Sequence, residues 1–351
     1  MRVACAVVFC VLSFCYLFFY QADLLTVEQH ILSKGKTTYQ PFIGAVLITT
    51  VLYLLQLCVF TVTRLYKRAH AMTYFPSVLF LLLLTVAHPV PREGSLSMGL
   101  WLWLAPILLV IFCWLCWLFN KCQPHEPKSF SVGFLSRITW INMLTMAGMF
   151  LVLGLVSNHN NIEHYKMRTE TLLLKGKYDD AWRVGSTTDT DSSLVLLRAY
   201  SLAKQNLLGE HLFELPLVGG SHSLRPDGET TSTMIYPQLE ILRFAAANAS
   251  DDYRLCAYLL DKDLVRFVQS VQKCYNINNS KELPKHYQEA LTLYMHKSSN
   301  PVIDYKDPVL EADYSDFQQL ERDIPEVIKR KNTIRDVYGN TYWYYYKYVA
   351  K

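Results

Sequence analysis

The first 156 residues consist of long apolar runs joined by short polar connections. Five runs contain no Asp, Glu, Lys or Arg, and they cover residues 3–20, 43–62, 75–88, 100–119 and 138–156. A helix of about 20 residues crosses the roughly 30 Å hydrocarbon core of a bilayer. The four runs of 18 to 20 residues therefore predict membrane-spanning helices.

The third run, residues 75–88, has 14 residues and is bracketed by Pro76 and Pro89, so it predicts either a span or a re-entrant segment. Basic residues decide between these, because cytoplasmic loops carry an excess of Lys and Arg. Five spans with the N-terminus inside place seven basic residues on the cytoplasmic side and three outside, whereas four spans leave five on each side. The seven are Arg2, Arg64, Lys67, Arg68, Lys121, Lys128 and Arg137. We therefore expect five spans, which put residues 157–351 on the outer side.

Residues 157–351 show helical periodicity and no long strand-like alternation. Two helical hairpins are predicted at 165–185 and 193–215. Further helices are expected at 236–248, 251–260, 263–275, 284–296, 314–322 and 325–348. The sequence thus predicts an all-α protein with two domains: a bundle of about five transmembrane helices in residues 1–156, and a soluble helical domain in residues 157–351.

Both hairpins resemble tetratricopeptide repeats, in which a Gly at the bend precedes an aromatic and a small residue. Gly176, Tyr178 and Ala181 carry this resemblance in the first hairpin. In the second, Asn206 stands at the bend and Gly209 at the small position. The resemblance implies an α-solenoid of helix pairs that offers a concave surface to another protein.

Taken whole, the chain resembles an uncharacterised family of bacterial inner-membrane proteins, a domain of unknown function with several spans and a repeat-like helical domain. Residues 283–291 (LPKHYQEAL) and 339–346 (GNTYWYYY) carry this resemblance. It implies a multi-pass protein of the bacterial inner membrane with a cytoplasmic N-terminus and a periplasmic C-terminal domain. It implies no activity.

Charge is unevenly divided along the 351 residues, of which 51% are hydrophobic and 18% are charged. Residues 1–156 contain ten Lys or Arg and four Asp or Glu, whereas residues 157–351 contain 24 and 26. This pattern excludes a wholly soluble enzyme, a secreted disulfide scaffold and a nucleic-acid binder with a basic surface. Since the second half is nearly neutral, we expect it to recognise a protein partner through shape and aromatic contacts.

Candidate chemical motifs are few. Cys113 and Cys116 have thioredoxin spacing but lie within an apolar run, where a thiolate is poorly solvated. Cys122 and His125 lack a second pair of ligands for zinc, and His159, Glu163 and His164 are expected to form a polar face next to the membrane. Cys256 and Cys274 are expected to be buried free thiols, with a disulfide as the alternative. No metal, cofactor or catalytic residue is predicted.

The most distinctive stretch is an aromatic tail near the C-terminus. Its members are Tyr342, Trp343, Tyr344, Tyr345 and Tyr346. A helix so rich in aromatic residues cannot direct every ring to one core, so some rings are expected at a second surface: a neighbouring repeat, the membrane interface or a partner. Core packing and an interface role both stay open for the tail. If the tail is an interface, deleting residues 340–351 leaves the domain folded.

These observations predict a non-enzymatic membrane protein that lies in the lipid bilayer and presents a helical domain for protein interaction or assembly; its oligomeric state is left open. The alternative is a membrane enzyme acting on lipid-linked glycan or envelope precursors through outer-loop residues such as Asp23, Glu28 and Glu93. Transport, a third function, would require a polar cavity that reaches Gln56.

Overall fold

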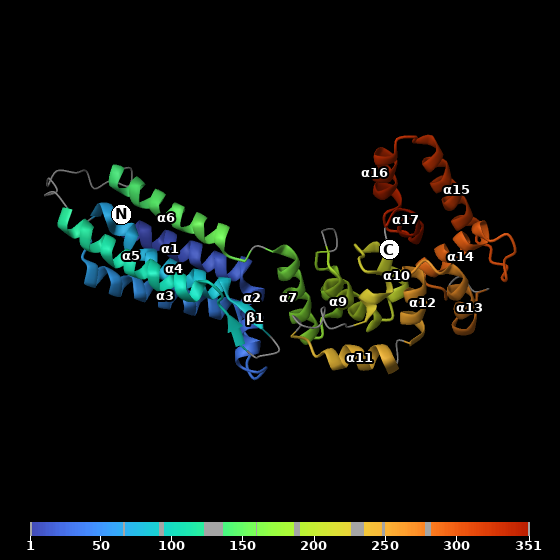
Figure 1. Cartoon of the computed structure of the whole chain (residues 1–351), viewed down its shortest axis with the longest axis horizontal. Coiled ribbons are helices and arrows are strands. Elements are labelled where there is room, and N and C mark those ends of the chain that lie inside the picture. Colours follow the sequence, from blue (N-terminus) through green and yellow to red (C-terminus); the bar gives the residue numbers. More distant parts are fainter. Residues whose placement is uncertain are drawn as a thin grey trace. The chain divides into compact units, whose positions relative to one another are not determined.

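The computed structural model describes residues 2–65, 67–90, 95–122, 136–158, 160–185, 190–225, 235–247, 250–277 and 282–349. Helices make up most of these residues, which confirms the predicted all-α class (Figure 1). A short antiparallel hairpin of β1 (His88–Val90) and β2 (Ser95–Ser97) accompanies them. The chain divides into two compact units, Met1–His164 and Tyr165–Lys351.

The first unit contains five helical stretches that are long and apolar enough to cross a membrane, as the apolar runs predict. These candidate spans are Arg2–Tyr20, Pro41–Thr63, Arg68–Val86, Trp101–Lys121 and Arg137–Val156. They are built from α1 (Arg2–Cys15) with a π-helical turn (Tyr16–Tyr20), α3 (Pro41–Thr63), a 3₁₀ helix (Lys67–Tyr74) with α4 (Phe75–Val86), α5 (Trp101–Cys122) and α6 (Arg137–Val156). Helix α2 (Ala22–Leu32) lies between the first two.

The third span, for which the length of the apolar run also allowed a re-entrant segment, is the most deeply buried of the five. Two thirds of it (67%) is buried within the protein, against 17–22% for the other four. It begins at Arg68, ahead of the predicted Phe75, because the 3₁₀ helix leads directly into α4. Pro76 stands in the first turn of α4, where its missing N–H breaks no helical hydrogen bond.

Polar side chains hold this 3₁₀ helix among apolar neighbours. Asn142 Oδ1 on α6 accepts a hydrogen bond of 2.7 Å from the backbone N–H of Ala71. Gln56 Nε2 on α3 donates to Thr73 Oγ1 at 2.9 Å, and Gln56 is 1% exposed. Buried polar groups are costly unless they are hydrogen-bonded, so these bonds offset the cost of burying an irregular backbone.

The second unit consists of helices of four to 16 residues (Figure 1). They are α7 (Asn161–Leu174), whose first four residues belong to the first unit, α8 (Tyr178–Arg183), α9 (Ser192–Ala203), α10 (Leu208–His211), α11 (Gln238–Ala247), α12 (Ser250–Leu260), α13 (Leu264–Cys274), α14 (Lys285–Lys297), α15 (Pro308–Asp323), α16 (Val327–Tyr338) and α17 (Tyr342–Tyr348), with 3₁₀ helices at Leu212–Glu214 and Gly220–Leu224. The predicted final helix, 325–348, is divided into α16 and α17 around Gly339.

Both predicted hairpin bends adopt the left-handed backbone conformation. Gly176 has φ +69° and Asn206 has φ +57°. Each bend is closed by a hydrogen bond of 2.9 Å, from Lys177 N to the carbonyl oxygen of Leu172 and from Leu207 N to that of Leu202. Gly and Asn are the residues that adopt this conformation at least cost, so the sequence pattern located both bends.

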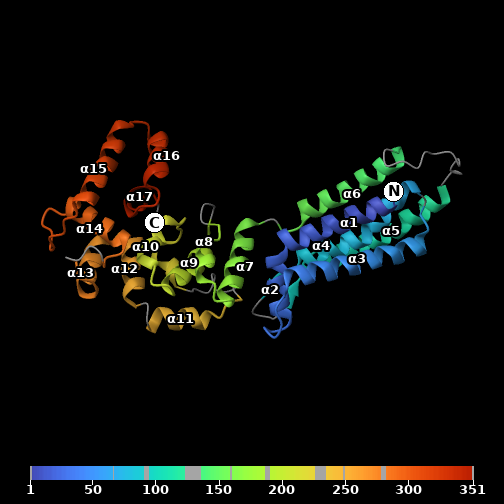
Figure 2. The ribbon, with the colours of Figure 1, turned by 180° about the vertical axis from the view of Figure 1, so that it is seen from behind.

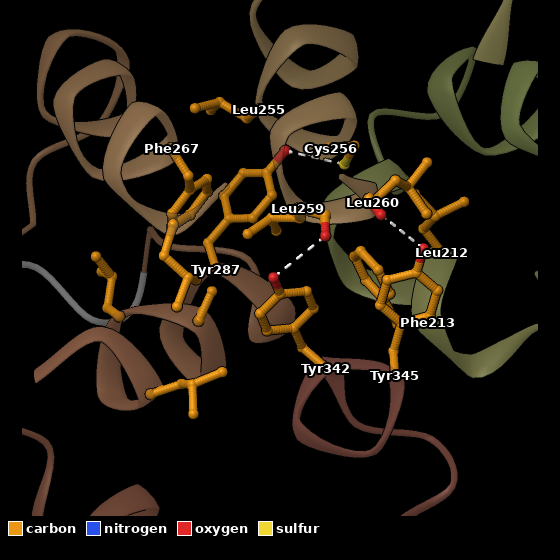
Figure 3. Close-up of a cluster of buried hydrophobic side chains, with 14 of the residues drawn as sticks. Leu212, Phe213, Leu255, Cys256, Leu259, Leu260, Phe267, Tyr287, Tyr342 and Tyr345 are labelled. Atoms are coloured by element: carbon orange, nitrogen blue, oxygen red, sulfur yellow. Dashed lines mark hydrogen bonds between the residues drawn. The ribbon is translucent and has the colours of Figure 1, made fainter. Parts of the chain in front are cut away.

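The core of the second unit joins helices from across residues 165–351, and Figure 3 shows its centre. Helices α10 and α14 approach closely because position 209 is a glycine. A Cβ atom at Gly209 would lie 2.7 Å from Cβ of Pro284 and 2.8 Å from Cζ of Tyr287. The small residue predicted here therefore has a packing role.

Two buried ionisable side chains tie connecting segments to the second unit. Arg198 on α9 donates through Nη2 to the carbonyl oxygens of Val184 and Gly185, at 2.5 and 2.7 Å, and its burial lowers its pKa to about 10. Glu170 on α7 accepts a hydrogen bond of 2.7 Å from Ile235 N. Its burial raises its pKa to about 8. Each side chain satisfies backbone groups of a non-helical segment.

Candidate interaction site

The aromatic tail forms helix α17, and the structure places most of its rings in the core. Tyr342, Trp343, Tyr344 and Tyr345 are 8% exposed or less. Figure 3 shows Tyr342 and Tyr345 pointing into the buried cluster, where their hydroxyls donate to the carbonyl oxygens of Leu259 and Leu260 at 3.1 and 2.8 Å. These four residues offer little surface to a partner. Among the five, Tyr346 is the partly exposed one.

Glu289 on α14 anchors the start of α17. Its Oε2 accepts hydrogen bonds of 2.7 Å from Tyr342 N and 2.9 Å from Nδ1 of His286. Its backbone oxygen accepts a hydrogen bond of 2.8 Å from Trp343 Nε1. Because Glu289 and His286 are both buried, loss of either partner would leave an unsatisfied polar group in the core.

Tyr346 lines a groove of about 670 Å³ on the second unit. The turn between α12 and α13 forms one part of its wall, and the C-terminal end of α14 forms another. The residues that define its chemistry are Lys262, Asp263, Arg266, Tyr294, Lys297 and Tyr346. We call this feature the Tyr346 groove. It combines two aromatic rings with three basic side chains.

Two lysines converge on the Tyr346 ring. Lys297 Nζ donates to Tyr346 Oη at 2.9 Å and lies 4.3 Å from the ring centroid. Lys262 Nζ lies 5.8 Å from the same centroid and donates to the carbonyl oxygen of Val349 at 2.7 Å. An ammonium above an aromatic face is stabilised by the ring quadrupole. The ring and backbone thus hold two positive charges at the groove wall.

The carboxylates of the groove already have partners within the chain. Asp263 caps α13 by accepting a hydrogen bond of 3.0 Å from Arg266 N, and it lies 3.4 Å from Arg266 Nε. Asp261 accepts a hydrogen bond of 3.1 Å from Ser221 N. Both acidic groups therefore have structural roles within the second unit.

Lys262 has an uncommon backbone conformation for its residue type. Its φ is +59°, and it forms the bend between α12 and α13, where Asp263 N donates to the carbonyl oxygen of Tyr258 at 2.8 Å. A non-glycine residue in this region costs about 1–2 kcal/mol. Gly176 and Asn206 occupy the two corresponding bends at lower cost. A lysine at this bend, with its side chain in the groove, is consistent with a binding role.

A second cavity, of about 400 Å³, is lined by other residues of α17. Tyr344 and Tyr345 contribute to it, together with Leu215, Leu217 and Arg335. Its lining is more apolar than that of the Tyr346 groove and carries fewer basic side chains. It is therefore a weaker candidate for recognition of a charged partner.

Two of the outer-loop carboxyls expected for an enzyme, Asp23 and Glu28, belong to helix α2 of the first unit. Glu28 on α2 is 5% exposed, and its Oε1 has no hydrogen-bond partner among the described residues. Burial raises the pKa of Glu28 to about 8. Asp23 lies in the first turn of α2, and Glu93 lies outside the described residues.

Cysteines 256 and 274 are free thiols, as expected. Cys256 is buried, and its Sγ lies 3.4 Å from Tyr287 Oη. Cys113 and Cys116 are also free. Within the described part of the chain, no three His, Cys, Asp or Glu side chains are close enough to hold a metal ion.

The polar residues that follow α6 contact one another. His164 Nε2 lies 3.1 Å from the carbonyl oxygen of Asn158, and Glu163 Oε2 accepts a hydrogen bond of 3.0 Å from Asn158 Nδ2. His159, the other histidine considered at this position, and His125 both lie outside the described residues.

One structural role could not be predicted from the sequence. Asp252 Oδ1 accepts hydrogen bonds of 2.8 Å from both Tyr275 Oη and Tyr287 Oη. Burial, with Cys256 and Asp252 nearby, raises the pKa of Tyr287 well above its ordinary value. No local pattern reveals such a pairing, because Asp252 lies on α12, Tyr275 directly follows α13 and Tyr287 lies on α14.

These features define an all-α protein with candidate membrane spans and a helical unit that carries a basic, aromatic groove. Residues 244–349 match a family of unknown function (DUF6057), so the match includes every residue that lines the Tyr346 groove and all of α17. It supports the expected resemblance to a domain of unknown function. No curated protein and no solved structure shows significant similarity to the chain.

Proposed function

We propose that the chain is a membrane protein whose second unit binds a protein partner in the Tyr346 groove. The observation that carries this proposal is the convergence of Lys262 and Lys297 on Tyr346 in a groove of about 670 Å³. A groove of this size accommodates a short peptide segment. The lysines favour a partner segment with a carboxylate, and Tyr294 and Tyr346 favour an adjacent apolar side chain.

The proposal includes the predicted repeat architecture and location. The bends at Gly176 and Asn206 support a stack of helical hairpins similar to tetratricopeptide repeats, although α8 and α10 have only six and four residues. The five candidate spans and the asymmetric distribution of basic residues support a bacterial inner membrane with the second unit on the periplasmic side. The enzyme alternative has less support, because Glu28 is buried.

Photo-crosslinking in native membranes tests this function. A photoreactive amino acid at Val265, which lines the groove and is 57% exposed, should capture a reproducible protein adduct identified by mass spectrometry. The same amino acid at Val309, which is 69% exposed and does not line the groove, is the matched control.

The substitution Lys297→Gln should reduce the adduct at position 265 by about tenfold or more, because it removes a charge–carboxylate hydrogen bond worth about 1.5–3 kcal/mol. Capture of the same proteins at both positions, or of this chain alone, would count against the proposal.

A further inference from the structure

Helices α15 and α16 form a helical hairpin with an exposed apolar tip. The two helices lie side by side in both views and are joined by residues 324–326 (Figures 1 and 2). At the tip, Val327 is 65% exposed and Ile328 is 73% exposed. Ile334, further along α16, is fully buried, so the core uses the other end of this helix and leaves the tip uncovered.

A run of basic residues follows these apolar side chains directly. Lys329 and Lys331 are exposed, and Arg330 is partly exposed. Asp323 and Glu326 precede them at the same tip. The hairpin end therefore carries a positive excess beside an apolar pair. This arrangement is typical of segments that lie at the boundary between headgroups and acyl chains.

We propose that this tip binds the surface of the bilayer through anionic lipid headgroups, with Val327 and Ile328 at the acyl boundary. Basic residues near an anionic leaflet each contribute about 1 kcal/mol, and the apolar side chains add burial energy. The five candidate spans keep the second unit tethered to a bilayer, so the bilayer surface is present at high local concentration. The tip shares no residue with the Tyr346 groove, so this proposal rests on the membrane location in the proposed function and not on binding in the groove.

The test uses the full chain reconstituted in liposomes of phosphatidylcholine, with and without phosphatidylglycerol. A photoreactive amino acid replaces Ile328, and mass spectrometry measures lipid adducts after illumination. The control position is Val302, which is 71% exposed and has no basic run beside it. We expect lipid adducts at position 328 to increase about tenfold when phosphatidylglycerol is present, whereas position 302 should not respond.

A charge variant separates headgroup binding from simple proximity. Since about 1 kcal/mol per basic residue corresponds to about fivefold in binding, the combined substitutions Lys329→Gln, Arg330→Gln and Lys331→Gln should bring position 328 down to the level of the control. All three side chains are at least partly exposed, so the core is unaffected. Equal lipid labelling at 302 and 328, or adducts at 328 to protein in place of lipid, would overturn the proposal.

Discussion

Single polar side chains join segments that are far apart in the chain. Glu289 links α14 to α17 across 53 residues through its bond to Tyr342 N. Asp252 links α12 to both Tyr275 and Tyr287 through hydroxyl groups. Because Glu289, Tyr287 and Tyr342 are buried, each bond removed leaves a buried partner unsatisfied at a cost of about 1–3 kcal/mol. The stability of the second unit is therefore sensitive to a few polar positions.

Gly209→Ala is expected to destabilise the protein, although alanine favours helices by up to about 1 kcal/mol. The added Cβ would lie 2.7 Å from Cβ of Pro284, and over-packing of this kind costs about 1–3 kcal/mol. The thermal midpoint of the purified protein in detergent should fall by several degrees. A midpoint equal to or above that of the wild type would contradict the packing role.

Glu170 predicts a pH dependence of stability. Its folded-state pKa of about 8 lies above its ordinary value of 4.5, so the folded state binds the proton more tightly than the unfolded state does. Stability is then highest below about pH 4.5 and is lost as the pH rises through about 8, by about 2–4 kcal/mol. Thermal unfolding at a series of pH values should show this decline. Glu170→Gln keeps an oxygen for Ile235 N and should flatten the curve; an unchanged slope would refute the assignment.

At the scale of the elements, helices lie where the sequence predicts them wherever the hydrophobic periodicity and the bend residues agree. The five apolar runs and most helices of the second unit lie within a few residues of their predicted positions. The third span was ambiguous because polar residues such as His70 and Thr73 interrupt its hydropathy. The hydrogen bond from Gln56 to Thr73 forms only when α3 packs against this segment. The Tyr346 groove could not be predicted from local sequence patterns either, because its wall combines α14 and α17 with the Lys262 bend. Only Tyr346 among its residues was singled out from the sequence.

Helix α17 is expected to be required for folding, in contrast to the interface hypothesis for the aromatic tail. A chain that ends at Asn340 loses four buried aromatic rings and leaves Glu289 without the Tyr342 N–H. We expect limited trypsin digestion in membranes to degrade its second unit much faster than that of the wild type.

Tyr346→Ala is the matched control for this truncation, since Tyr346 is partly exposed. It should keep the protease resistance of the wild type while reducing the amount of partner that is photo-crosslinked at position 265. A truncated chain as resistant as the wild type would show that α17 is dispensable for folding.

On the scale of the whole molecule, the two units have different physical requirements. The first unit has most of its apolar surface exposed, as on Leu144 (75%) and Val110 (69%), which suits contact with lipid. The second unit keeps its aromatic residues inside and has nearly balanced charge. This division accounts for the moderate hydropathy of the chain as a whole, which averages two very different surfaces.

Reporter fusions test the proposed topology. With five spans and the N-terminus inside, alkaline phosphatase joined after Lys351 should be active in bacterial cells, and green fluorescent protein at the same position should be dark. A fusion after Lys121, at the end of the fourth candidate span, should give the opposite result. The basic residues near the spans provide the physical reason for this orientation. A fluorescent fusion after Lys351 would place the second unit on the cytoplasmic side and contradict the proposed topology.

The hydrogen bond from Tyr342 to Leu259 also sets a time order during synthesis. These residues are 83 positions apart, so at about 5–20 residues per second the ribosome needs roughly 4 to 17 s to make the second partner after the first. During that interval α12 and α14 exist without the helix that completes their packing. The membrane spans, made earlier, can insert before the second unit reaches its final fold. A chaperone that shields this half-built core would therefore act in the interval between insertion and the synthesis of α17.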